Sequence, residues 1–396
     1  MDFLQKIVKL SCNISMSHQL EYDYIIAGAG CAGLSLAMHL IRSGDFGNKK
    51  ILLIDRAPKT VNDRTWCFWE MGTGLFERIV YAEWERLLFF ARDFSGELVI
   101  DPYRYKMIRG IDFYDHCLER IRAEPNFTIR FEPVDHVFSS DVTTGISVGG
   151  RTIHCEYVFN SIIFERPLLS EKEYWMLQHF RGWLVETDAP LFSPQLATLM
   201  DFRTGQQWGT AFFYVLPFSE KRALIEYTLF SPQVLDAEQY SQGLDKYIRE
   251  VLQIDRYRTV DEESGVIPMT NCQFLPNQNN IINIGTAGGQ TKGSSGYTFQ
   301  FIQKHSAQLT AQLKATGKPF IRAGRRRHSF YDSILLNILH HKVLTGESIF
   351  TRLFEKNAPA RVLKFLDNET SLAEELKIIS SLPTMPFLKA AIEQML

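Results

Sequence analysis

The sequence predicts an α/β fold in which an N-terminal βαβ unit is followed by an antiparallel sheet lobe and a helical C-terminal region. Three observations support this prediction. Residues 22–55 run in the order strand, glycine turn, helix and strand. Residues 182–230 contain long stretches that alternate between apolar and polar side chains, and residues 330–354 carry apolar side chains at helical spacing. Such periodicity is the main signal of secondary structure in a single sequence.

The N-terminal unit contains a glycine motif where its first strand meets its helix. Gly28, Gly30 and Gly33 follow the apolar run Tyr24–Ala27. In a dinucleotide-binding unit the first glycine allows the tight turn, the second lets the backbone approach a pyrophosphate, and the third lets helix and strand pack closely. The free amides and partial positive charge of the helix N-terminus favour phosphate. Asp55, which ends the second strand, is expected to accept hydrogen bonds from a ribose.

Two other structures could contain this stretch. A glycine-rich turn can occur in an unrelated α/β domain, and residues 24–41 are nearly uncharged and about long enough for a membrane span. The strand-to-helix spacing of the glycines and the charged residues at both edges favour the dinucleotide-binding unit.

The composition predicts a globular protein in one or two lobes. Of 396 residues, 45% are hydrophobic and 22% are charged, and the net charge of -2 gives no reason to expect a nucleic-acid partner. Six cysteines are scattered without a C-x-x-C pair, so neither a disulfide framework nor a metal site is expected, and a reducing cytoplasmic location fits. Twenty-nine phenylalanines indicate either a very aromatic core or a pocket for a large apolar ligand.

Domain boundaries follow from these patterns. Residues 1–21 are predicted to form an N-terminal extension, a short amphipathic stretch without the apolar core or cleavage site of a signal peptide. Residues 22–165 and 265–320 form the predicted nucleotide-binding domain. Residues 166–264 form the antiparallel-sheet substrate lobe, and residues 321–396 form the helical C-terminal region.

Further elements are expected within the first domain. Residues 87–100 are predicted to be two strands around a Ser95–Gly96 turn, and residues 112–122 have a helical pattern. Residues 127–131 and 153–159 are predicted strands, the second of which rejoins the parallel sheet.

Residues 63–70 contain Trp66 and Trp69 beside an arginine and two acids. Exposed tryptophan is unfavourable unless it packs against something. The segment either crosses a cofactor and presents aromatic faces to a ligand, or it forms a hydrophobic plug beneath the first domain.

The middle of the chain predicts an antiparallel sheet that could serve as a ligand platform. Its strands are expected at residues 183–186, 196–202, 210–216 and 223–230, with residues 217–222 as a polar turn that joins the last two in a hairpin.

Alternation in the last of these strands places Glu226 on one face with Leu224, Thr228 and Phe230. A carboxyl group among apolar neighbours has its pKa raised by desolvation, which keeps it protonated near neutral pH and makes it a proton donor. The alternative is a glutamate that faces water at a sheet edge or pairs with a lysine or arginine.

Towards the C-terminus a second loop of small residues, 285–296, lies between a predicted strand at 281–284 and a helix at 297–316. It repeats the arrangement of a phosphate loop before a helix N-terminus, whereas a flexible linker would not have tight strand and helix neighbours. No second G-x-G-x-x-G is present, so two dinucleotide domains are not expected. The basic cluster 325–328 before the apolar stretch 330–354 indicates either an anionic membrane surface or a solvated face beside a core helix.

Several of these motifs together resemble the FAD-containing fold of aromatic hydroxylases and geranylgeranyl reductases and, within that group, lycopene cyclases. The resemblance covers about residues 22 to 390. It depends on five segments in order, which are YIIAGAGCAGLS at 24–35, DRTWCFW at 63–69, FYVLPFS at 213–219, IEYT at 225–228 and GTAG at 285–288.

Two positions depart from the patterns of related proteins. Lycopene cyclases carry a Glu followed by Glu or Asp and then Thr on the middle strand, whereas here Glu226 is followed by Tyr227. The departure supports Glu226 as the essential acid and puts a second carboxylate at that position in doubt. Hydroxylases of this fold usually carry Gly-Asp in the late loop, where this chain has Gly285–Thr286, which disfavours an oxygen-activating enzyme.

The resemblance implies a lycopene β-cyclase, an isomerase that closes the acyclic ends of lycopene into β-rings, giving β-carotene through γ-carotene, without net redox change. It implies non-covalent FAD, active in its reduced form, with NADPH as the reductant. Glu226 is the implied acid, and Trp66, Trp69, Phe212 or Tyr214 could stabilise the cation. The implied cofactor-binding residues are Gly28, Gly30, Gly33, Asp55, Arg56, Arg64, Thr65, Gly285, Thr286, Gly288 and Gly296.

The substrate, lycopene or a related acyclic carotene, does not dissolve in water. The resemblance therefore implies a cytoplasmic enzyme attached peripherally to the membrane from which it draws the substrate, with other carotenoid enzymes as further partners. Two rival classes stay open, a flavin-dependent reductase or hydroxylase that acts on an isoprenoid, and a non-enzymatic carotenoid- or flavin-binding protein. Also open are β versus ε rings and cyclisation of one end or both.

Overall fold

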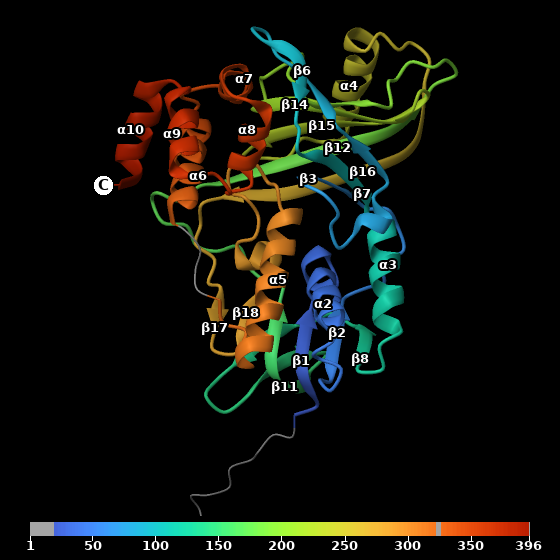
Figure 1. Ribbon diagram of the computed structural model, residues 1–396, viewed down its shortest axis with the longest axis vertical. Helices are drawn as coiled ribbons and strands as arrows, with labels where there is room; N and C mark the ends of the chain where they lie inside the picture. The colour runs from blue at the N-terminus through green and yellow to red at the C-terminus, as the bar shows by residue number, and fades with distance from the viewer. Residues whose placement is uncertain (1–19, 322–325, 396) are drawn as a thin grey trace, which may run out of the picture.

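The computed structural model describes residues 20–321 and 326–395. Nearly all of the expected N-terminal extension lies outside these ranges, and so does part of the basic cluster at 325–328. Figure 1 shows one half built from a parallel sheet and its helices below and a large sheet above, with the C-terminal helices stacked beside that sheet.

An eight-stranded sheet forms the lower half of the molecule in Figure 1. Its centre is β1 (Tyr22–Ala27), which pairs in parallel with β2 (Ile51–Asp55) and β11 (Arg151–Asn160). The continuous apolar runs in β1 and β2 suit strands that are covered on both faces. The other strands are β8 (Phe127–Phe131) and β18 (Ile281–Asn283), both parallel, and the antiparallel β9 (His136–Ser139), β10 (Thr144–Val148) and β17 (Asn277–Gln278).

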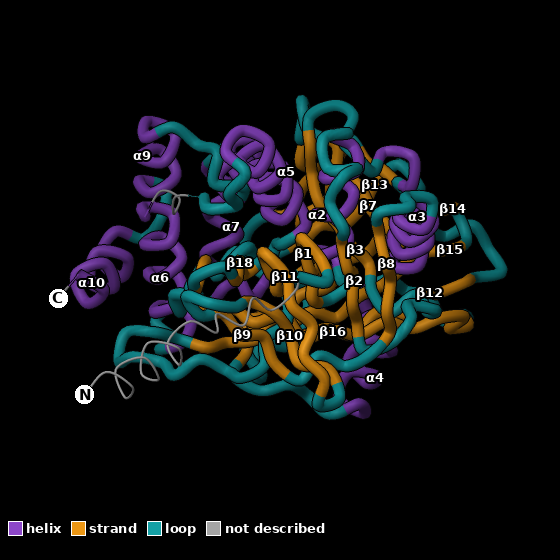
Figure 2. The backbone as a smooth tube through the Cα atoms, turned by 90° about the horizontal axis from the view of Figure 1, so that it is seen from below, coloured by secondary structure: helices purple, strands orange, loops and turns teal. Residues whose placement is uncertain are grey.

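Three helices cover one face of this sheet. They are α2 (Cys31–Ser43), α3 (Gly110–Arg122) and α5 (Phe299–Thr316). The opposite face packs against side chains of β9, β10 and their flanking loops. Figure 2 views this half from below and shows the strands beside the purple helices.

A seven-stranded sheet forms the upper layer, in the order β16-β12-β15-β14-β13-β5-β6. The strands are β5 (Arg86–Phe90), β6 (Ser95–Val99), β12 (Trp175–Glu186), β13 (Leu196–Asp201), β14 (Thr210–Ser219), β15 (Arg222–Ser231) and β16 (Arg258–Thr270). One face packs on α4 (Ala237–Lys246) and the π-helical turn Tyr247–Val251. The other face forms a core with C-terminal helices, which are α6 (Arg326–His340), α7 (Gly346–Lys356), α8 (Pro359–Leu366), α9 (Leu372–Ser380) and α10 (Thr384–Met395).

A small three-stranded sheet connects the two halves. It consists of β3 (Thr65–Glu70), β7 (Arg104–Arg109) and β4 (Ala82–Trp84), and a 3-10 turn at Glu77–Ile79 lies between β3 and β4. A separate 3-10 turn, Gly285–Gly288, lies in the late loop after β18. Side chains of β3 and β7 contribute to the cores of both halves.

The expected strands and the β14–β15 hairpin are present, but three features of the upper sheet differ from expectation. The β5–β6 turn lies at residues 91–94, so Ser95 and Gly96 are inside β6. β5 and β6 join the upper sheet, where β13 pairs with β5 in parallel. β16 was not predicted, and it continues through Gly265, where the sequence indicated a boundary. Its acidic first half hides the alternation that marks a strand.

The apolar stretch 330–354 does not form a membrane-facing surface of its own. Its residues Leu336 and Ile338 are fully buried, and α6 and α7 pack into the core beside the upper sheet. Part of the basic cluster at 325–328 lies outside the described residues, so docking of this region on an anionic membrane stays a prediction. Among the helices that the structure describes, none combines the length and hydropathy needed to span a bilayer.

The aromatic stack under the upper sheet predicts a stability effect. Phe213 lies between Tyr227 and Tyr247, with ring centroids 4.5 and 3.8 Å away. Replacing a buried phenylalanine by alanine removes apolar contacts and leaves a cavity, so Phe213→Ala is expected to lower the free energy of unfolding by about 3 to 5 kcal/mol. Urea denaturation followed by circular dichroism measures this. Phe164→Ala, at a side chain that is 42% exposed, is the control and should change stability little.

Candidate active site

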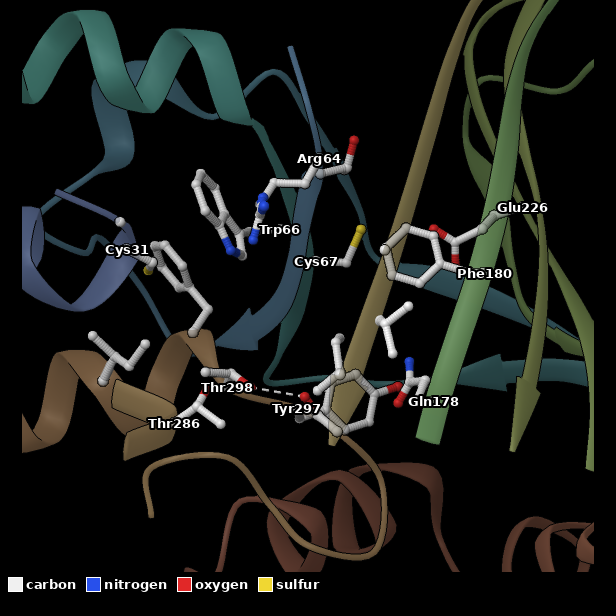
Figure 3. A pocket seen from close by; sticks show the side chains of 18 of the residues that line it. Cys31, Arg64, Trp66, Cys67, Gln178, Phe180, Glu226, Thr286, Tyr297 and Thr298 are labelled. Atoms are coloured by element: carbon white, nitrogen blue, oxygen red, sulfur yellow. Dashed lines mark hydrogen bonds between the residues drawn. The ribbon is translucent and has the colours of Figure 1, made fainter. Parts of the chain in front are cut away.

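A cavity of about 370 Å³ lies where the two halves of the molecule meet. The N-terminus of α2 and the late glycine loop line one part of it, and β12, β15 and β16 of the upper sheet line another. In Figure 3, Cys31, Arg64 and Trp66 lie on one side of the cavity, and Phe180 and Glu226 lie on the other. We call these the nucleotide side, for the α2 end, and the acid side, for the Glu226 end.

The nucleotide side has the backbone geometry that the glycine motif predicts. Gly28 adopts a φ of 101°, which favours glycine, and a Cβ on Gly33 would lie 1.9 Å from the carbonyl oxygen of Gly28. Helix α2 begins at Cys31 with Gly30 as its N-cap, and no side chain caps it or adds an acid to its first turn. Its terminal amides can therefore bind a phosphate group in the cavity.

The predicted cofactor-binding residues divide into two groups. One group lines the cavity and consists of Gly30, Arg64, Thr65, Gly285, Thr286 and Gly296. The other group is not part of the lining and consists of Gly28, Gly33, Asp55, Arg56 and Gly288. Among these, Gly28 and Gly33 shape the turn that places α2.

Asp55 is turned towards the glycine loop. Its Oδ2 accepts a hydrogen bond from the amide of Ala29 at 2.7 Å, and its Oδ1 forms an ion pair with Lys59 at 3.2 Å. The side chain is buried, whereas the neighbouring Arg56 is exposed. Asp55 thus fixes the loop that would carry the phosphates, and binding of a ribose by Asp55 stays a prediction.

The two tryptophans of β3 lie in different surroundings. Trp66 faces the cavity, as a ligand-contacting side chain would, whereas Trp69 packs inside a hydrophobic core. Trp66 lines the cavity and packs edge-on against Phe113, with ring centroids 4.9 Å apart. Trp69 is 2% exposed and belongs to the core of the upper half. Phe212 is likewise fully buried in that core. The hypothesis that Trp69 or Phe212 faces a cation in the cavity is therefore wrong.

Glu226 stands on the acid side, as the alternation of β15 predicts. Its carboxyl lines the cavity, and its Oε1 accepts a hydrogen bond of 2.6 Å from the hydroxyl of Thr228. Burial raises the pKa of Glu226 well above its usual range, and the negative charge of the nearby Glu263 raises it further. The hydrogen bond from Thr228 opposes the shift without cancelling it. The direction of this shift favours the protonated form of the Glu226 carboxyl group.

Aromatic side chains surround the acid side. Phe180, Tyr214 and Tyr297 all line the cavity, and burial raises the pKa of both tyrosines, so their hydroxyls are neutral. The two tyrosine hydroxyls lie 3.5 Å apart. Neutral aromatic faces can stabilise a cation without competing for a proton.

A second carboxyl group, Glu263 on β16, lies behind Glu226. It is 6% exposed and accepts a hydrogen bond of 2.6 Å from the hydroxyl of Thr65. Burial raises the pKa of Glu263 as well. The hydroxyl of Thr65, predicted to contact the cofactor, therefore donates its hydrogen bond to this acid.

The chain matches a protein-family model and curated proteins over most of its length. A family model described as "Lycopene cyclase protein" matches residues 23–392. The chain belongs to the lycopene cyclase family. The lycopene beta-cyclase of Pantoea ananas is 25% identical over 399 residues, which cover 94% of this chain and 97% of that protein. The family predicted from the sequence motifs is thereby confirmed.

Solved structures show the same fold for this lycopene cyclase family member. A geranylgeranyl bacteriochlorophyll reductase-like protein from Thermoplasma acidophilum matches with a TM-score of 0.56 and 12% identity, covering 94% of this chain and 95% of that one. Aklavinone-11 hydroxylase, solved with FAD and aklavinone, matches with a TM-score of 0.56 and 13% identity over 75% of this chain and 63% of its own. The predicted fold class is confirmed.

Sequence reasoning missed several residues of this lycopene cyclase site. Glu263 was missed because β16 was not recognised as a strand, and its acidic first half gives no alternation that could have marked it. Phe180 and Gln178 on β12 were missed because the predicted strand began only at residue 183, while β12 begins at Trp175. Residues 175–182 were left unassigned, so nothing linked them to the cavity.

The glycine turn predicts a test of dinucleotide binding. In Gly33→Ala the new methyl group would overlap the carbonyl of Gly28 and displace the N-terminus of α2. We expect at least a tenfold loss of affinity for FAD, or about 1.4 kcal/mol, measured by flavin fluorescence titration. Gly47→Ala, where a Cβ would meet nothing within 4 Å, is the matched control and should bind FAD normally.

Proposed function

We propose that the protein is a lycopene β-cyclase that closes the acyclic ends of lycopene into β-rings by acid catalysis, without net redox change. The observation that carries the proposal is Glu226, a protonated carboxylic acid in the wall of a cavity whose far side suits a dinucleotide. Membership of the lycopene cyclase family supports the choice of substrate class.

Glu226 acts as the general acid in this proposal. Its proton adds to the terminal carbon–carbon double bond and leaves a tertiary cation, and the π electrons of a neighbouring double bond then form the ring bond. Loss of a proton from a ring carbon restores the neutral product. One proton enters and one leaves, so the product is an isomer of the substrate. Thr228 holds one oxygen of the Glu226 carboxyl in place through its hydrogen bond.

The cation forms in a cavity where water cannot solvate it. The faces of Phe180, Tyr214 and Tyr297 can provide cation–π attraction there, about 1 to 2 kcal/mol for each desolvated contact. The tyrosine hydroxyls stay neutral because burial raises their pKa, so they do not quench the cation as anionic nucleophiles.

Non-covalent FAD in its reduced, anionic form would supply negative charge beside the cation. The residues that would hold it are those of the nucleotide side, namely the α2 N-terminus at Gly30, Arg64 just before β3, and Gly285, Thr286 and Gly296 of the late loop. NADPH is proposed as the source of reducing equivalents, and it needs only transient contact.

We also propose peripheral contact with a cytoplasmic membrane, because an acyclic carotene must be taken from a bilayer. Two C-terminal helices supply an apolar surface for this contact. Both helices expose apolar side chains at helical spacing. These are Leu372, Leu376 and Ile379 on α9 and Met385, Leu388, Ile392 and Met395 on α10. Exposed apolar faces of this kind suit the interface of a membrane. Other carotenoid enzymes could share that surface.

The acid role predicts the behaviour of Glu226→Gln. The amide keeps the shape of the side chain but has no acidic proton, so cyclisation should fall at least about 100-fold while FAD is retained. Pigments extracted from a lycopene-accumulating bacterium that expresses the variant, separated by chromatography, give the readout. Glu220→Gln, in the exposed turn of the same hairpin, should cyclise like the wild type. Normal cyclic product from Glu226→Gln would rule out the acid role.

NADPH consumption separates this function from the rival redox class. A cyclase that needs only a reduced flavin makes many rings per NADPH, whereas an isoprenoid reductase or hydroxylase consumes NADPH in proportion to product. A carotenoid-binding protein without activity would return lycopene unchanged.

The membrane contact predicts liposome binding that depends on α10. Replacing Met385, Leu388 and Ile392 by serine removes apolar side chains that are 73%, 50% and 47% exposed, so co-sedimentation with liposomes should weaken several-fold. The control replaces Val142 and Leu168, which are 80% and 98% exposed on other surfaces, and should bind like the wild type. Equal binding by both variants would contradict this surface assignment.

A further inference from the structure

Glu226 and Glu263 come from strands that are not neighbours in the sheet. β12 lies between β15 and β16, and its residue Gly182 pairs with Glu226 on one side and with Glu263 on the other. A Cβ on Gly182 would lie 3.0 Å from the Cδ1 of Leu224, 3.1 Å from the Cγ of Glu263 and 3.6 Å from the Cβ of Glu226. The missing side chain leaves a gap over the middle strand that these three side chains border, and each of the two carboxyl groups shifts the pKa of the other.

Glu263 has only part of its hydrogen bonding satisfied by the rest of the protein. Its Oε2 accepts from Thr65, while its Oε1 is buried and has no donor among the described groups when both carboxyls are ionised. Leaving a buried carboxylate oxygen without a donor is unfavourable. One proton on the adjacent carboxyl of Glu226 supplies the missing donor.

The two acids, Glu226 and Glu263, lie together on one face of the sheet only. The preceding residue, Glu262, points to the opposite face and forms an ion pair with Arg181, the neighbour of Gly182 on β12. Within residues 20–321 and 326–395, no arginine or lysine forms an ion pair with Glu263. Two acids therefore share a site, and like charges at this separation resist ionising together.

We propose that Glu263 is a positioning residue that shares one proton with Glu226 across Gly182, and so keeps the catalytic acid protonated and oriented between turnovers. The inference rests on the proposed function and extends it to a second carboxyl. When Glu226 gives its proton to the substrate, the pair is left with two negative charges, and the proton released from the ring returns to it. Protons therefore balance over one turnover, and no electrons are transferred.

The groups around the pair are neutral or acidic. Several titratable or hydrogen-bonding side chains act on one or both carboxyls. They are Thr65 and Cys67 on β3, Asp63 before it, Tyr214 on β14, Thr228 on β15, Asp261 on β16, and Tyr297. Burial raises the pKa of Cys67, Tyr214 and Tyr297, so these remain uncharged near neutral pH. Activity should therefore fall as pH rises through the raised pKa of Glu226, because the proton is then lost.

Glu263→Gln tests the proposal in the FAD-loaded enzyme. Without the negative charge of Glu263, the pKa of Glu226 falls, and the alkaline limb of the activity profile should move to lower pH by about one unit or more. Glu262→Gln, one residue earlier and on the opposite face, is the matched control and should leave the limb in place. A limb that does not move in Glu263→Gln would overturn the proposal.

Gly182→Ala provides a second variant that keeps both carboxyls. Its methyl group would occupy the gap and separate them, so the alkaline limb should shift in the same direction as in Glu263→Gln. An unshifted limb in Gly182→Ala would contradict sharing of the proton across this gap.

Infrared spectroscopy separates this proposal from the proposed function. In substrate-free enzyme labelled with 13C-glutamate, the carboxylic-acid carbonyl band should disappear in Glu226→Gln and titrate at lower pH in Glu263→Gln than in wild type. This readout needs no cyclisation. A protein that makes no cyclic carotene but shows the shifted band would refute the cyclase function and keep the pair. Identical bands in wild type and Glu263→Gln would refute the pair.

Discussion

The site depends on holding one carboxylic acid away from water in a wall of the cavity. Desolvation favours the neutral form of a carboxyl group, and β15 places Glu226 where apolar and aromatic side chains surround it. The upper sheet makes this possible because both of its faces are covered, one by α4 and the other by the C-terminal helices. A thinner covering would let water reach the acid, and its pKa would return towards the ordinary value.

The two sides of the cavity have complementary electrostatic character. On the nucleotide side, α2 directs uncapped amides and a partial positive charge inward, which suits phosphate. On the acid side, the groups beside Glu226 are a second acid and neutral aromatic rings, so a positive charge on a substrate would be favoured there. The three-stranded sheet connects the sides, because β3 presents Trp66 to the cavity and the hydroxyl of Thr65 to Glu263, and Arg64 just before β3 also lines the cavity.

The sequence predicted those features that depend on residues close together in the chain. The glycine turn, the βαβ order and the side on which Glu226 lies follow from short-range spacing, and the structure has all three. The order of strands in the upper sheet does not follow from spacing, since it depends on pairing between distant segments. For this reason the contribution of β5 and β6 to that sheet could not be predicted. The different positions of Trp66 and Trp69 likewise depend on distant segments, because Phe113 of α3 packs on Trp66 and Tyr297, just before α5, packs on Trp69.

Sheet geometry also explains how Tyr227 can occupy a position where lycopene cyclases carry a second acid. Successive side chains of a strand point to opposite faces, so residue 227 faces away from the cavity, and Tyr227 stacks there on Phe213. A carboxylate at that position could not reach a substrate in the cavity in this fold. The second carboxyl beside Glu226 comes instead from β16, two strands away, because Gly182 leaves the strand between them without a side chain. The pair of acids is therefore built by the order of strands in the sheet, and adjacent residues in the sequence do not supply it.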